Sequence, residues 1–285
     1  ATFTSITDYK DYEKLLFIDV DAAPVNQLAN YAGVDATSFT QEFRINGETD
    51  SSRWVGGLFY LSIDNKSDNG LKAPSGSIVN TFFGAPFDIG VVSELQTDSY
   101  SIFGQYEYDL RENLTLTAGL RLIREEKDFQ TEIGFLFSND NFTVNQGDFL
   151  PNVPLPGAPF TADLDSSDTF WTGKLNLDWR PSDDMLVYAG VNRGVKAGSF
   201  NAPLLGAFLG SGGVDALPYG EETLISYEAG FKKTLADGRS TLNASVFYYD
   251  YSDYQAFLFV GVGGVVINAD AENYGAEIEF QTSPA

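Results

Sequence analysis

A chain of 285 residues has room for one large all-β domain or for two domains of ordinary size. It contains neither cysteine nor histidine, which excludes disulfides and thiol chemistry and removes the commonest general base and metal ligand. The formal charge of −23, from 17 basic and 40 acidic residues, argues against a nucleic-acid partner, because phosphates are bound through lysine and arginine. The longest nearly unbroken apolar run, 256–267, is too short for a membrane helix, which needs ~20 residues. Any contact with a membrane is therefore expected to be made by strands.

Apolar and polar residues alternate with a period of two along most of the chain, which predicts about ten β-strands. In chain order, the predicted strands are 2–12, 39–45, 54–63, 97–108, 114–122, 170–179, 185–191, 225–232, 242–248 and 273–280. The clearest pattern spans 97–127, a hairpin around a polar turn. Its alternation predicts one apolar face and one wet face.

The period also predicts which side chains face outward and which face inward. The outward set, expected to be exposed to lipid, comprises Tyr106, Leu116, Leu120, Trp171, Leu175 and Leu177. The inward set comprises Thr117, Arg121, Thr172, Lys174 and Asn176.

Turn lengths alternate between short and long. Short turns fall near residues 49, 111, 182 and 237, and long connections are predicted at 65–95, 130–168 and 198–220. The second connection contains a proline-dense segment through which no strand can run. Aromatic residues cluster at the predicted strand ends, as in the girdles of membrane barrels. This combination predicts an all-β, antiparallel transmembrane β-barrel with its long loops outside the cell. A soluble β-sandwich gives the same alternation and remains open.

Motifs for metal binding and catalysis are weak. Residues 64–70 partly match the pattern of an EF-hand calcium-binding loop. They lack the oxygen ligand at the third position and the closing glutamate, so they fail as an EF-hand. Asp163, Asp165 and Asp168 could gather a cation, although a solvated acidic loop is the commoner arrangement. A hydrolytic triad without histidine or cysteine would need an unusual base. We therefore predict no metal, no cofactor and no enzymatic activity.

Charged residues recur on the inward face of the predicted strands. In a sandwich this face would be the solvent side, whereas in a barrel it would be a wet lumen or a surface on which a plug domain docks. These residues are Arg121, Lys174, Asp178, Glu228, Lys232, Glu277 and Glu279.

An ordered set of segments resembles the barrel strands of TonB-dependent outer-membrane receptors. The resemblance covers most of the chain outside the long loops. The segments are 40–45 (TQEFRI), 54–60 (WVGGLFY), 103–108 (FGQYEY), 116–126 (LTAGLRLIREE), 192–201 (NRGVKAGSFN), 218–232 (PYGEETLISYEAGFK) and 271–279 (AENYGAEIE).

The resemblance implies a 22-stranded barrel in the bacterial outer membrane, plugged by an N-terminal globular domain. Residues 1–285 are then expected to be an interior part of one barrel domain, about ten strands of it, with the plug domain and the segment that binds the TonB-type periplasmic protein absent from this sequence. The implied function is energy-coupled, ligand-gated uptake of a scarce nutrient such as an iron chelate, a corrinoid or a glycan. The partners implied are outer-membrane lipid, the plug domain, the TonB-type protein and the ligand.

Two other readings of the function stay open. A complete ten-stranded barrel could be a passive outer-membrane pore or porin, and a soluble, secreted β-rich module could bind a partner. Under the receptor reading, ligand contacts are expected in the lumen and the loops. The candidates are Arg121, Lys174, Arg193, Lys196, Phe200 and Asn201.

Overall fold

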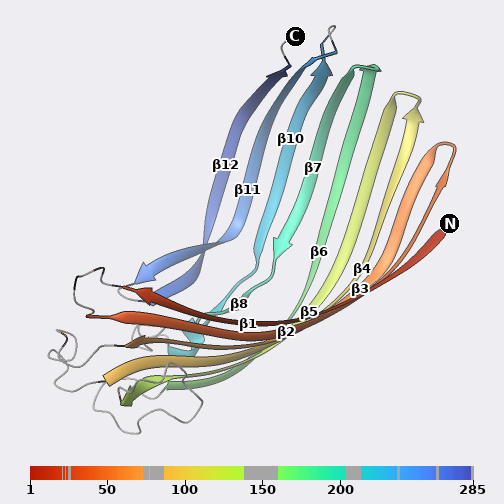
Figure 1. Ribbon diagram of the computed structural model, residues 1–285. Helices are drawn as coiled ribbons and strands as arrows, with labels where there is room; N and C mark the ends of the chain where they lie inside the picture. The colour runs from red at the N-terminus through yellow and green to blue at the C-terminus, as the bar shows by residue number, and fades with distance from the viewer. Residues whose placement is uncertain are drawn as a thin grey trace.

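The computed structural model describes residues 1–20, 22, 24, 27–72, 77, 87–137, 160–202, 213–235, 238–260 and 263–283. Its strands are β1 (Thr2–Asp19), β2 (Ala29–Thr49), β3 (Ser52–Lys72), β4 (Phe87–Arg111), β5 (Leu114–Phe137), β6 (Phe160–Ser182), β7 (Met185–Lys196), β8 (Ser199–Phe200), β9 (Pro218–Tyr219), β10 (Glu222–Thr234), β11 (Ser240–Val260) and β12 (Gly263–Thr282). Ten of them form one antiparallel sheet in the order β1-β2-β3-β4-β5-β6-β7-β10-β11-β12 (Figure 1). β8 and β9 pair with each other in the connection between β7 and β10. The prediction of about ten antiparallel strands is confirmed.

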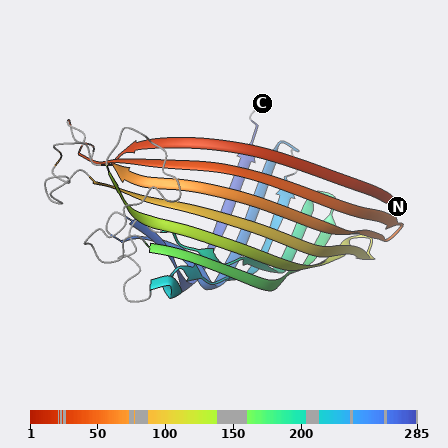
Figure 2. The same ribbon diagram turned by 90° about the horizontal axis from the view of Figure 1, so that it is seen from below.

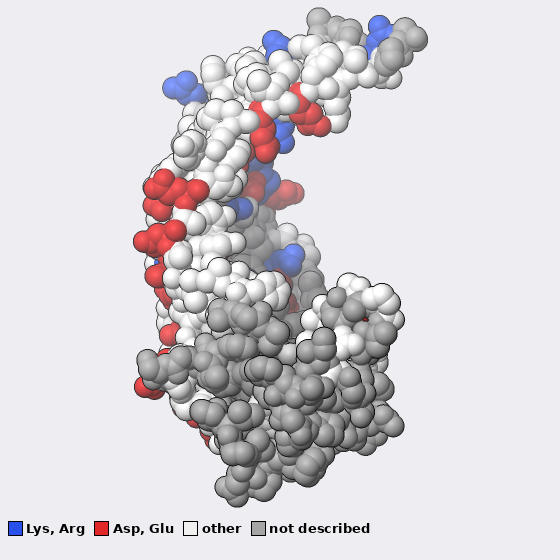
Figure 3. Space-filling view, turned by 90° about the vertical axis from the view of Figure 1, so that its left-hand side faces the viewer, with Lys and Arg blue, Asp and Glu red and all other residues white. Residues whose placement is uncertain are grey.

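The sheet is bent into an open trough (Figures 1 and 2). In the space-filling view the molecule is a crescent with a hollow on its inner side (Figure 3). The turns after β2, β4, β6 and β10 lie at one end of the trough, and the longer connections lie at the other (Figure 1). A wall of this shape has a convex face and a concave face, and the pleat sends alternate side chains to each.

The convex face carries the apolar side chains. The register sets Leu58 opposite Ile102, Ile102 opposite Leu122, and Leu122 opposite Trp171, so that they form a row across β3 to β6. Such cross-strand pairs are the unit of sheet stabilisation. They nevertheless leave the side chains open to the surroundings, since Leu175 on this face is 53% exposed. The predicted outward and inward sets both follow the observed register.

Two predicted long connections are shorter than expected. β3 continues to Lys72 and β4 starts at Phe87, so much of 65–95 is strand; β5 and β6 likewise extend into 130–168. The β3 extension is polar on both faces from Asp64 to Asn69, so the alternation ends there although the backbone ladder continues. Farther along, Leu71 of β3, Val91 of β4 and Ile133 of β5 form a small buried apolar cluster. Residues 198–220 contain β8, β9 and a short 3₁₀ turn at 213–216. Residues 73–76, 78–86, 138–159 and 203–212 of these connections lie outside the described residues. The extracellular position of all three connections stays a prediction.

The two edges of the sheet are β1 and β12, which are each paired on one side only. The ten strands therefore do not close on themselves, and the alternative of a complete ten-stranded barrel is wrong for this structure. An open sheet edge cannot face hydrocarbon, because its unpaired backbone groups would have no partners there. Among the described residues, no helix has the length and apolar character needed to cross a bilayer.

Candidate ligand-binding surface on the concave face

A hollow of about 680 Å³ lies on the concave face between β2 and β7. The side chains of Arg44, Arg121 and Lys174 reach it, together with the rings of Phe59 and Phe103. Each comes from a different strand, and the inward parity of each strand brings them to the same face. The hollow thus combines aromatic surface with positive charge.

Arg121 lies against two aromatic rings. Its guanidinium carbon is 5.2 Å from the centroid of Phe59 and 6.0 Å from that of Phe103. The ring of Phe103 fits because its partner on β3 is Gly57, where a Cβ would come within 2.6 Å of the ring. Cation–π contacts of this kind contribute roughly 0.5–2 kcal/mol and fix the plane of the guanidinium. The Nε of Arg121 is buried and has no hydrogen-bond partner among the described residues.

Lys174 is the diagonal neighbour of Arg121. The register pairs Lys174 with Gly119 and Thr172 with Arg121, and the lysine chain lies over Gly119, where a Cβ would be 3.2 Å from its Cγ. Diagonal positions of this kind lie ~7–8 Å apart, so long side chains can reach a common group. Neither cation forms an ion pair with a described residue, whereas Arg44 donates from Nε to Glu42 at 2.7 Å. Arg121 and Lys174 therefore leave unneutralised positive charge in the hollow of an acidic protein.

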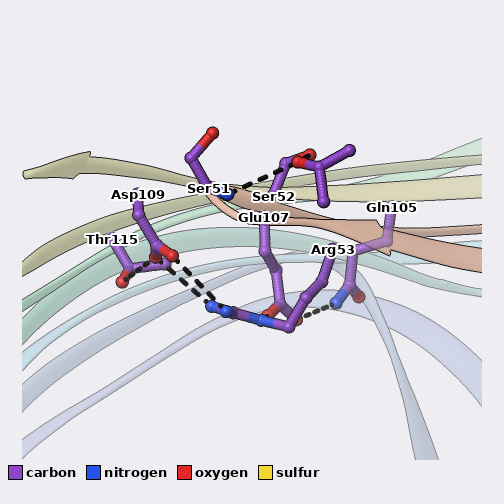
Figure 4. Close-up of polar contacts among 8 residues, drawn as sticks. Ser51, Ser52, Arg53, Gln105, Glu107, Asp109 and Thr115 are labelled. Atoms are coloured by element: carbon purple, nitrogen blue, oxygen red, sulfur yellow. Dashed lines mark hydrogen bonds and ion pairs between the residues drawn. The ribbon is translucent and has the colours of Figure 1, made fainter. Parts of the chain in front are cut away.

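A second polar cluster lies on the concave face near the short turns (Figure 4). Arg53 on β3 donates from Nε to Glu107 at 3.0 Å and from Nη2 to Asp109 at 3.3 Å, both on β4. Thr115 on β5 donates to the same Asp109 at 2.7 Å, and Gln105 donates to Glu107 at 2.8 Å. The single cation of this cluster is paired with two carboxylates, and the contacts tie three strands together, so we assign the cluster to stabilisation of the sheet and not to ligand binding.

The connection between β7 and β10 packs against the concave face at the other end of the trough. The rings of Phe200 and Phe129 stack with their centroids 4.9 Å apart and their planes 5° apart. Leu217, which is fully buried, packs with Phe129 in the same cluster. Asn201 exchanges two hydrogen bonds with the backbone of Val266 on β12. This segment therefore spans the concave face from β5 to β12.

The six candidate residues fall into four places. Arg121 and Lys174 meet in the hollow. Phe200 and Asn201 are engaged in the contacts just described, and Lys196 is exposed at the end of β7 opposite Glu222. The parity of Arg193 directs its side chain to the convex face, where it lies against Trp171, although the residue is also among those that border the hollow.

Parity alone would have placed Arg193 outside, since it lies two residues after the outward Val191. The sequence pattern did not identify Phe59 and Phe103 as parts of the site. Their inward parity was available as a signal, but nothing local indicated that both flank Arg121. Within the described part of the chain, no group of three or more acidic side chains is placed to hold a metal ion.

An antiparallel sheet with an apolar convex face and a polar concave face is the wall of a transmembrane β-barrel. The family model described as TonB dependent receptor-like, beta-barrel, matches residues 2–283, and the chain belongs to this family. It is therefore part of an outer-membrane barrel.

Curated relatives and solved structures agree with this membership. The chain is 30% identical over 148 residues to the pesticin receptor of Yersinia enterocolitica, covering 51% of this chain and 20% of that protein. It is 32% identical over 125 residues to the pesticin receptor of Yersinia pestis, covering 44% and 16%. The fold resembles the ferric yersiniabactin uptake receptor FyuA from Yersinia pestis with a TM-score of 0.68 at 19% identity, covering 98% of this chain and 36% of that one. The copper transporter OprC gives 0.67 at 15% identity, covering 99% and 42%.

The chain thus spans about a fifth or less of the length of these curated relatives.

Proposed function

We propose that this chain forms part of the lumen wall of an active importer that carries a scarce nutrient across the outer membrane. Family membership over 2–283 is the observation that carries the proposal. The polar concave face supports it, because a translocation path needs a wetted wall. The energy would come from a TonB-type periplasmic protein, whose contact segment is assigned to no residue here.

The ligand class that we propose is an anionic iron chelate. The unpaired charges of Arg121 and Lys174 favour a carboxylate or similarly charged group, and the neighbouring rings of Phe59 and Phe103 favour a ligand with flat apolar parts. The ferric yersiniabactin receptor, by its name, takes up an iron chelate. The alternative ligand class is a corrinoid or a neutral glycan. A neutral glycan would gain no charge attraction from the two unpaired cations.

The concave face would also contact the receptor's own plug domain. Glu228, which accepts a hydrogen bond from Tyr188 at 2.7 Å, faces the lumen, as do Glu277 and Glu279 on β12. A carboxylate-rich stretch of wall favours basic side chains on a domain docked against it.

Uptake of radiolabelled iron chelates tests this function, in a strain whose only receptor for iron-chelate uptake is the full-length protein. We expect uptake under iron starvation that is abolished by a protonophore and by deletion of the TonB-type protein. Arg121→Gln with Lys174→Gln should reduce uptake of an anionic chelate about tenfold, since charged hydrogen bonds contribute ~1.5–3 kcal/mol.

The matched control is Lys232→Gln, which removes another concave lysine, one that pairs in register with Asn243 outside the hollow. It should leave uptake near wild type. Uptake that persists without the TonB-type protein and without a proton gradient would indicate a passive pore. Uptake of a corrinoid or glycan that the double variant leaves unchanged would overturn the anionic ligand class.

A further inference from the structure

Arg193 places a positive charge on the convex, lipid-facing surface. The register pairs it with Gly173 on β6 and with Ile225 on β10, on the face that also presents Trp171 and Leu175. These two neighbours are 48% and 53% exposed. A charged side chain on the lipid face of a barrel is costly at the middle of the bilayer, and the cost falls toward the headgroups. The position of Arg193 therefore requires a polar partner.

The guanidinium of Arg193 is held in a fixed orientation. Its carbon lies 4.4 Å from the centroid of the Trp171 ring, in cation–π geometry. Nη1 donates to the carbonyl oxygen of Trp171, and Nη2 donates to Oγ1 of Thr223 at 3.2 Å. Of the five N–H donors of an arginine, two are used by these bonds to described residues.

No described residue neutralises Arg193. It forms no ion pair within the described part of the chain. Arg124 provides the contrast on the same face, since its Nε donates to the carboxylate of Glu126 at 3.2 Å. The guanidinium group of Arg193 is thus held in one orientation, carries its charge and is available to an external anion.

The site lies at the end of the wall that carries the long connections. Arg193 is three residues from the end of β7, and Thr223 is the second residue of β10. Tryptophan is typical of the water–lipid interface, and an arginine beside it reaches the headgroups. A rigid guanidinium fork matches the oxygens of a phosphate.

An apolar groove begins next to this cation. It has a volume of about 580 Å³ on the convex face, and Val191, two residues from Arg193, lines it together with Leu175, Tyr227 and Val246. The groove has width because the register places Ala189 opposite Leu177 and Ala229. The apolar lining of the groove can pack against the acyl chain of a lipid. Arg193, at the end of the groove, can bind an anionic headgroup of the same lipid.

We propose that Arg193, Trp171 and Thr223 bind the phosphate of an anionic lipid whose acyl chain occupies the groove from Val191 to Val246. The lipid belongs to the leaflet that surrounds the long-connection end of the barrel. This inference rests on the membrane location and not on the transported ligand, so its failure leaves the importer proposal untouched.

Native mass spectrometry of the full-length receptor in detergent tests the proposal, with bisphosphorylated lipid A as the probe. Wild type should retain this lipid, and Arg193→Gln should retain it about tenfold less, as expected for the loss of charged hydrogen bonds. Arg124→Gln is the matched control, because it removes an outward arginine that is already paired. Heat-modifiable migration on gels confirms that each variant is folded.

Three further measurements decide between sources of the effect. Lipid A without phosphates should bind wild type and Arg193→Gln equally. Inorganic phosphate at millimolar concentration should not displace the lipid, because the groove contributes to binding. Ala229→Phe, which fills the groove, should reduce retention while leaving Arg193 in place.

Equal retention by wild type and Arg193→Gln would overturn the proposal, as would equal losses in the Arg193 and Arg124 variants. If Arg193→Gln does not fold, Arg193→Lys and Thr223→Val replace it with the same expected direction.

Discussion

Asn201 binds the backbone of Val266 as a neighbouring strand would. Its Oδ1 accepts from the Val266 N–H at 2.7 Å, and its Nδ2 donates to the Val266 carbonyl oxygen at 3.0 Å. The two residues are 65 positions apart and Asn201 is 92% buried. This side chain attaches the connection between β7 and β10 to β12, together with Asn268 of β12, which exchanges hydrogen bonds with the backbone of Gly220.

Replacing this asparagine should release the connection. Asn201→Ala leaves a donor and an acceptor of Val266 without their partners, which costs ~1–3 kcal/mol for each buried group. Hydrogen exchange of the full-length receptor should then accelerate at residues 213–220, with strands β3 and β4 unchanged. Asn201→Asp keeps the acceptor and should be intermediate. Unchanged exchange in Asn201→Ala would mean that Phe200, Leu217 and the Asn268–Gly220 hydrogen bonds suffice to hold the segment.

The facing of β6 predicts opposite responses at two adjacent residues. Leu175→Arg should destabilise the folded receptor by ~2–4 kcal/mol in lipid, because the guanidinium would face hydrocarbon. Lys174→Arg should be nearly neutral, since its side chain faces the lumen. Unfolding by urea in lipid vesicles measures both. Lipid-soluble probes should label cysteine placed at Leu175, and labelling at Lys174 instead would reverse the facing.

The orientation of the wall can be checked with single cysteines, because the chain has none of its own. Asp215 lies in the connection between β7 and β10, and Asp183 lies in the short turn between β6 and β7; both are exposed. A membrane-impermeant maleimide added to intact cells should label cysteine at Asp215 but not at Asp183. Permeabilised cells should allow both reactions. The opposite pattern would place the short turns outside.

The Arg53 cluster should contribute modestly to stability. Arg53→Ala removes contacts to Glu107 and Asp109, but the arginine side chain is 49% exposed and solvent screens the interaction. We therefore expect a small loss of stability that shrinks in high salt. Arg111→Ala, at the end of β4, is the control and should change little. Urea unfolding at two ionic strengths is the measurement, and a salt-independent loss would contradict an electrostatic origin.

The turn between β6 and β7 should respond to pH through Asp184. The hydroxyl of Ser182 donates to this carboxylate and lowers the pKa of Asp184, with a smaller contribution from Lys233. A lowered folded-state pKa stabilises the fold above about pH 4, and the effect is lost as the pH falls through that lowered pKa. Ser182→Ala should therefore lower the unfolding midpoint at about pH 7 and have a smaller effect at about pH 2. An equal effect at both values would rule out the carboxylate as its source.

The sequence by itself determined which way the membrane-spanning parts of the strands face. Leu175 and Lys174 were assigned to opposite faces correctly, because the pleat enforces a period of two wherever one face is covered by lipid. The same rule failed at the strand extensions around Asp64, where both faces are polar. There the backbone ladder alone continues the strand, and it carries no side-chain signal.

Only the tertiary structure decided which residues meet. Arg121 lies against Phe59 and Phe103 because the registers of β3, β4 and β5 align them, and a register is a relation between strands that no local pattern contains. The bond from Asn201 to Val266 joins segments 65 residues apart for the same reason. Periodicity is a property of one strand, whereas a site on a barrel wall is built across several, so facing could be predicted and the assembled hollow could not.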